Sequence, residues 1–99
     1  MIKMVKRSTL EINLGILHTI KEGKRKGEKV GSWYIQRNLM IGPSTFRKYE
    51  NFLTEKGFIV KEEKQYSLTD KANDVIEYIE KIYYGLKENK SLESIVFEG

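Results

Sequence analysis

The sequence predicts an α+β fold in which a three-helix core is followed by a β-hairpin and then by a long C-terminal helix. Three observations predict it. Apolar residues recur at helical spacing in four segments, glycine or proline marks most of the boundaries between them, and two short strand-like runs directly follow the third helix. Ninety-nine residues make one domain. The chain has no cysteine, so neither a disulfide nor a thiolate metal site is available.

The first helix is expected to begin at Ser8, which is placed to form a capping box with Glu11, and to end at Gly23. Gly15 lies inside this helix, where the missing side chain would allow another helix to approach closely. The expected apolar stripe consists of Leu10, Leu14, Ile16, Leu17 and Ile20.

A loop rich in glycine and lysine, residues 23–29, leads to a short second helix. Val30 could form a strand of one or two residues on the way. Ser32 is expected to cap the helix, which runs from Trp33 to about Leu39. The Trp33 side chain is expected to pack against the core or the hairpin.

The third helix is expected from Pro43, a favourable first helical residue, to Lys56, with Gly57 as its stop. Met40 stands in the preceding turn, at a position that often needs a positive φ, which glycine adopts at less cost than methionine. One face of the helix is apolar, with Phe46, Tyr49 and Leu53. The opposite face carries Ser44, Arg47, Lys48, Asn51 and Glu55.

The hairpin is expected from strands at 58–60 and 66–68, with Glu62, Glu63 and Lys64 at its tip. Thr69 then caps the last helix. An apolar seam recurs along this helix at Ala72, Val75, Ile79, Ile82 and Leu86, widened by Ile76 and Tyr83. This seam could pack on its own domain, but its length favours a homodimer interface.

A helix followed directly by a hairpin is the layout of a winged helix-turn-helix, and the charge distribution suits a polyanionic partner. Residues 1–61 hold 13 Lys+Arg and 5 Asp+Glu, a net +8, whereas residues 62–99 hold 5 lysines and 9 acids, a net −4. The basic part contains the third helix, whose polar face has the residue types that bind DNA.

The segments 46–49, 55–59 and 66–71, together with Leu53, carry a family resemblance. The chain resembles small archaeal winged-helix DNA-binding proteins that dimerise through a C-terminal coiled-coil helix, similar to proteins encoded by archaeal viruses. The resemblance implies that helix 43–56 enters the major groove of double-stranded DNA and that the C-terminal helices pair antiparallel, although the seam itself leaves the orientation open. The implied contacts are Ser44, Thr45, Arg47, Lys48 and Asn51.

The expected division is a DNA-binding domain at 1–69, a dimerisation helix at 70–90 and a tail of unknown structure at 91–99. Further DNA contacts are expected outside the third helix, because their side chains suit phosphate. They are Lys24, Arg25 and Lys26 in the basic loop, Tyr34 and Arg37 on the second helix, and Lys61 and Lys64 on the hairpin. The acidic hairpin tip departs from the family pattern, since phosphate should repel it.

The function predicted from these residues is a dimeric transcriptional regulator. Two alternatives remain: an architectural DNA binder with little sequence preference, and a winged-helix module that binds proteins. No catalytic set or phosphate-binding glycine loop is visible, and the single histidine, His18, has no convergent metal ligands. We therefore expect no enzymatic activity, cofactor, metal or small-molecule ligand. Neither a signal peptide nor a membrane span is evident, so we expect a cytoplasmic protein.

Overall fold

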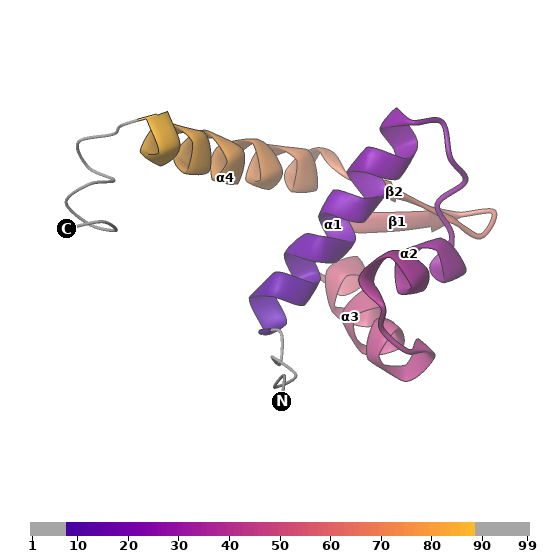
Figure 1. Ribbon diagram of the computed structural model, residues 1–99. Helices are drawn as coiled ribbons and strands as arrows, with labels where there is room; N and C mark the ends of the chain where they lie inside the picture. The colour runs from indigo at the N-terminus through magenta and orange to yellow at the C-terminus, as the bar shows by residue number, and fades with distance from the viewer. Residues whose placement is uncertain (1–7, 89–99) are drawn as a thin grey trace.

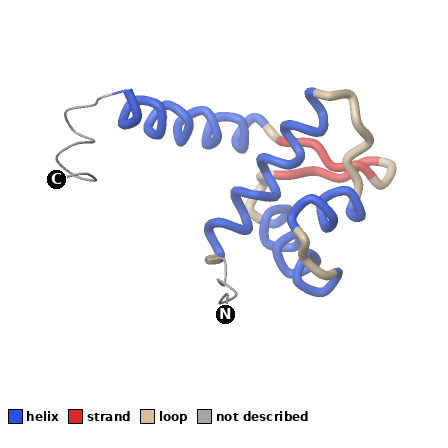
Figure 2. Tube along the Cα trace, viewed as in Figure 1, coloured by secondary structure: helices blue, strands red, loops and turns tan. Residues whose placement is uncertain are grey.

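The computed structural model describes residues 8–88, with side chains described as far as residue 82. The tail at 91–99 and the side chains of Tyr83 and Leu86 therefore lie outside the described part. The elements in chain order are α1 (Thr9–Arg25), α2 (Ser32–Leu39), α3 (Pro43–Glu55), β1 (Ile59–Glu62), β2 (Gln65–Leu68) and α4 (Asp70–Glu88). Figures 1 and 2 show three helices and the hairpin gathered in one body from which α4 projects. The predicted α+β layout is confirmed.

The start of α1 matches the prediction, and its end does not. Ser8 and Glu11 form the capping box, with the Glu11 backbone N–H 3.1 Å from Ser8 Oγ. The helix continues past Gly23 to Arg25, and Gly27, at φ +80°, is the glycine that lets the chain turn away. Gly23 is instead buried against Val30 and against Tyr34 of α2, and an added Cβ would lie 2.5 Å from Val30 Cγ2. It is a close-approach residue, and Lys24 and Arg25 are helical.

The buried face of α1 is rotated from the predicted stripe. Ile16, Leu17 and Ile20 are buried as expected, together with Ile12, whereas Leu10 is 65% exposed. The close approach predicted at Gly15 is confirmed, because an added Cβ would lie 3.0 Å from Leu39 Cδ2 of α2.

Two expectations for α2 are wrong. The N-cap is Gly31 rather than Ser32, whose hydroxyl accepts a hydrogen bond from Gln36 Nε2 at 2.6 Å. Trp33 packs neither on the core nor on the hairpin, and its side chain is 69% exposed. Ile35 is the residue that anchors the helix in the core, and Trp33 lies on the opposite side of the helical wheel. Met40 ends the helix at φ 56°, the positive value predicted for this turn.

The hairpin β1–β2 is antiparallel, with Val60 opposite Ser67 and Glu62 opposite Gln65. Glu63 and Lys64 form its two-residue turn, and both have positive φ, as a tight hairpin turn requires. The loop before α2 joins the outer edge of β2, where the Tyr66 N–H donates to the Val30 carbonyl at 2.8 Å. Val30 makes this contact without being part of a strand.

Helix α4 begins at the predicted cap, where the Ala72 N–H donates to Thr69 Oγ1 at 3.2 Å. Its first two turns belong to the monomer core, since Ala72 is fully buried and Ile76 is only 8% exposed. Lys21 of α1 holds the next turn through an ion pair with Glu80 at 3.2 Å. Beyond this turn α4 leaves the body (Figure 1). Two residues predicted for the dimer interface, Ala72 and Ile76, are thus buried within the monomer.

Candidate nucleic-acid interface

Helix α3 presents its polar face to solvent because its apolar face is buried. Phe46, Tyr49 and Leu53 lie in the core, as predicted, at 3%, 8% and 1% exposure. The residues expected to contact DNA lie on the other side. Ser44, Arg47, Lys48 and Asn51 are exposed, and Thr45 is half-buried.

The hairpin is fixed to α3 through Tyr66. This side chain is buried, and its ring meets Phe46 edge to face at a centroid distance of 5.8 Å. Its hydroxyl donates a hydrogen bond to the Glu50 carboxylate. Burial, assisted by this carboxylate, raises the pKa of the Tyr66 hydroxyl, which therefore remains a neutral donor. The hairpin thus has a defined position beside the exposed face of α3.

A groove runs between α3 and β1. It is lined by Arg47, Glu50, Asn51, Thr54 and Glu55 of α3 and by Lys61 of β1. The Lys61 Nζ lies 5.5 Å from the centroid of the Tyr66 ring, so the contact that fixes the hairpin also places a cation at the groove. The structure therefore brings three of the predicted DNA contacts, Arg47, Asn51 and Lys61, to one site.

The sequence of residues 6–86 matches the family model described as winged helix-turn-helix. The chain belongs to the winged helix-turn-helix family. In the terms used for this family, α2 and α3 form the helix-turn-helix, α3 is the recognition helix, and the β1–β2 hairpin is the wing. Such domains typically bind DNA and are not enzymes, so the match indicates DNA as the partner. No curated protein sequence matches the chain at a significant level.

Two of the cations predicted to contact DNA, Arg25 and Lys24, lie next to acidic side chains. The Arg25 guanidinium is paired with Glu22, with Nη2 2.7 Å from Oε1, and this hydrogen bond lowers the pKa of the Glu22 carboxyl. Lys24 shares a hollow with Glu62, Glu63, Gln65 and Ser67 of the wing. Neither cation lies in the α3–wing groove.

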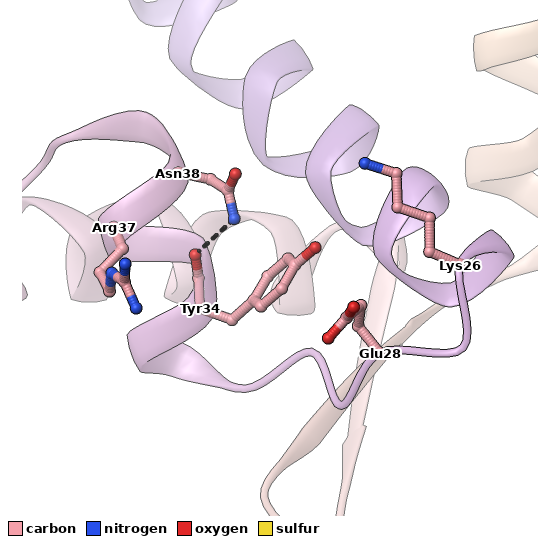
Figure 3. A pocket seen from close by; sticks show the side chains of 5 residues that line it. All are labelled: Lys26, Glu28, Tyr34, Arg37 and Asn38. Atoms are coloured by element: carbon pink, nitrogen blue, oxygen red, sulfur yellow. Dashed lines mark hydrogen bonds between the residues drawn. The ribbon is translucent and has the colours of Figure 1, made fainter.

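A second hollow lies between α2 and the end of α1. Figure 3 shows the Tyr34 ring at its centre, with Arg37 on one side and Lys26 and Glu28 on the other. Tyr34 is half-buried, and its ring lies near Gly23 of α1. The Asn38 amide donates to the Tyr34 carbonyl at 2.9 Å. Lys26 and Arg37 are thus exposed cations outside the α3–wing groove.

The wing tip is acidic and exposed, as the sequence indicates. Glu62, Glu63 and Lys64 all lie in solvent. A DNA contact from Lys64 stays a prediction. The carboxylates of Glu62 and Glu63 beside it would oppose such a contact.

Sequence reasoning missed Glu50, Thr54 and Tyr66 as parts of the site. Glu50 and Tyr66 are 16 residues apart and meet only because the wing folds back along α3. The helical wheel gave no signal for Glu50, because its position is on the border between the buried and exposed faces.

Two classes of site are absent from the described residues 8–88. No group of three or more His, Cys, Asp or Glu side chains there is placed to hold a metal ion. None of the helices in this part combines the length and apolarity that crossing a membrane requires.

Proposed function

We propose that this protein is a double-stranded DNA-binding transcriptional regulator that reads the major groove with α3. The observation that carries the proposal is the exposed polar face of α3 beside a wing that Tyr66 and Glu50 hold in place. A helix of 13 residues is about 20 Å long and fits a major groove about 12 Å wide.

Four exposed side chains of α3 suit chemical groups that DNA presents. Arg47 is suited to donate two hydrogen bonds to guanine O6 and N7, and Asn51 is suited to adenine N6 and N7. Lys48 and Ser44 are suited to phosphate oxygens. Lys61 in the α3–wing groove, with Lys26 and Arg37 beyond it, would add phosphate contacts that position the domain without reading sequence.

The proposal includes a homodimer formed through α4. Val75 and Ile79 are half-buried in the monomer, and Ile82, farther along, is 46% exposed. A second copy of α4 would cover this surface, and the two recognition helices would then address half-sites about 34 Å apart or a multiple of that. Light scattering that gives the mass of one chain at micromolar concentration would contradict the dimer. An archaeal or viral source stays a prediction.

The direct test of DNA binding is a titration of fluorescent duplex DNA at increasing salt. Affinity should fall steeply as salt rises, because each neutralised phosphate releases counterions. Lys48→Ala should weaken binding to all duplexes and reduce the magnitude of the salt slope by about 1. Lys81→Ala, which removes the same charge from the exposed surface of α4, is the matched control. Equal effects of the two variants would contradict a contact through α3.

The acidic wing favours a second candidate function, a module that binds a basic protein surface. Glu62 and Glu63 are both exposed at a tip that phosphate would repel. Absence of duplex binding at low salt would favour this function. Binding with equal affinity for unrelated duplexes would favour an architectural role instead of a regulatory one.

A further inference from the structure

Glu55 is a carboxylate on the face of α3 that otherwise suits DNA. It is the last residue of α3, is exposed, and lines the groove with Arg47 and Asn51. Its carboxylate makes no ion pair or hydrogen bond with another described side chain, although Lys61 lines the same groove. The other carboxylate of the groove, Glu50, is engaged by the Tyr66 hydroxyl. Glu55 is therefore the acidic group left to face a ligand.

Arg47, Asn51 and Glu55 form a row, because each is four residues from the next. Four residues advance a helix by about 6 Å, and base pairs are stacked about 3.4 Å apart. A helix lying along the groove would thus place successive members of the row about two base pairs apart. The distance from Arg47 to Glu55 corresponds to three or four base pairs, roughly 12 Å.

A free carboxylate in a DNA interface weakens binding to phosphate, so its effect on affinity is unfavourable unless a base offers it a donor. Cytosine does so through its N4 amino group, with no acceptor beside it in the major groove. Guanine presents only acceptors there, and thymine presents an acceptor and a methyl group. Adenine has an N6 amino donor, but its N7 acceptor lies beside it and would repel a carboxylate. The carboxylate is thus attracted most to cytosine and is repelled by guanine and thymine, which is how an interface gains specificity.

We propose that Glu55 is a specificity-determining residue that selects cytosine by accepting a hydrogen bond from its N4 amino group. The cytosine should lie three or four base pairs from the guanine that Arg47 contacts, because the helix rises roughly 12 Å between Arg47 and Glu55. This inference rests on the proposed function, since it assigns a base to a further residue of the same recognition helix.

The test is a selection of binding sites from random duplexes with the wild-type protein, Glu55→Gln and Glu77→Gln. Glu77 is exposed on α4, so its substitution makes the same charge change away from the groove. Wild type and Glu77→Gln should select cytosine at the stated distance from a guanine. In Glu55→Gln the preference for cytosine should fall about tenfold and move toward adenine, which glutamine reads. The guanine preference should not change.

Two results would overturn the inference while leaving the proposed function intact. One is a wild-type site with no cytosine preference at that distance. The other is a Glu55→Gln variant that binds every duplex more tightly by the same factor, which would mean that Glu55 only repels phosphate, whatever the sequence. Failure of the wild-type protein to bind any duplex would overturn the proposed function and, with it, this inference.

Discussion

The Tyr66 hydroxyl donates a hydrogen bond to the Glu50 carboxylate and so joins the wing to the recognition helix. The ring of Tyr66 is buried against Phe46, and its oxygen reaches the groove side of α3. Because Arg47 and Lys61 line that groove from the two joined elements, the bond fixes the spacing of the proposed DNA contacts as well as the fold.

Removing the hydroxyl should loosen this junction without emptying the core. Tyr66→Phe keeps the ring against Phe46 and should lower the free energy of unfolding by about 1–2 kcal/mol, since the bond is to a charged acceptor. Urea denaturation gives the value. Combined with Glu50→Ala, the loss should be smaller than the sum of the two single losses. Additive losses would mean that the two side chains do not interact in solution.

Alkaline pH should weaken the fold through the same tyrosine. Its pKa is raised above the ordinary value of 10.0, so the folded state retains the proton to higher pH than the unfolded state. The contribution of Tyr66 to stability is therefore complete below pH about 10 and declines as pH rises above it. Denaturation midpoints measured from neutral pH upward should show this decline in the wild type. Tyr66→Phe should show a shallower decline, and an identical slope would contradict the assignment.

The two glycines of α1, Gly15 and Gly23, should respond differently to alanine. A Cβ at Gly23 would lie 2.5 Å from Val30 Cγ2, and the short, stiff valine cannot move aside within the core. A Cβ at Gly15 would meet the rotatable end of Leu39 at 3.0 Å. Gly23→Ala should therefore lower the melting temperature despite the gain in helix propensity of about 1 kcal/mol. Gly15→Ala serves as its control and should be closer to neutral. The reverse order would contradict the packing of α1 on α2.

Met40 is expected to be a destabilising residue. It adopts φ 56° at the end of α2 and is 87% exposed, so its side chain gains little packing in return. Met40→Gly should raise the free energy of unfolding by about 0.5–1 kcal/mol, because glycine adopts this conformation without strain. Met40→Ala keeps the Cβ and should give no such gain. Equal gains would show that the loss of the exposed methionine side chain, and not backbone strain, is responsible.

The sequence predicted those parts of the fold that depend on local signals. The capping box of α1, Pro43 at the start of α3, Gly57 at its end and the Thr69 cap of α4 each depend on residues close in the chain, and all are observed. The apolar face of α3 followed from helical spacing alone.

The incorrect predictions concern residues whose surroundings are determined by tertiary packing. Gly23 looks like a helix stop, but its use as a contact for Val30 and Tyr34 appears only when α2 lies on α1. Tryptophan is a residue type that is often buried, but burial of Ile35 orients α2 so that the Trp33 side chain faces solvent. For the same reason helical spacing predicted the exposed groove residues Arg47, Asn51 and Glu55 of α3. It did not predict Glu50 and Thr54, or the Tyr66–Glu50 contact that shapes the groove.

The most direct test of the account is whether Arg47 discriminates between DNA sequences. The affinity of wild type, Arg47→Ala and Lys26→Ala should be measured on a selected duplex and on an unrelated one at the same salt. Arg47→Ala should lose roughly 5- to 150-fold of the preference for the selected duplex, which corresponds to one bidentate contact with guanine. Lys26→Ala should weaken both duplexes alike. An Arg47→Ala variant that keeps the wild-type preference would contradict reading of the major groove by α3.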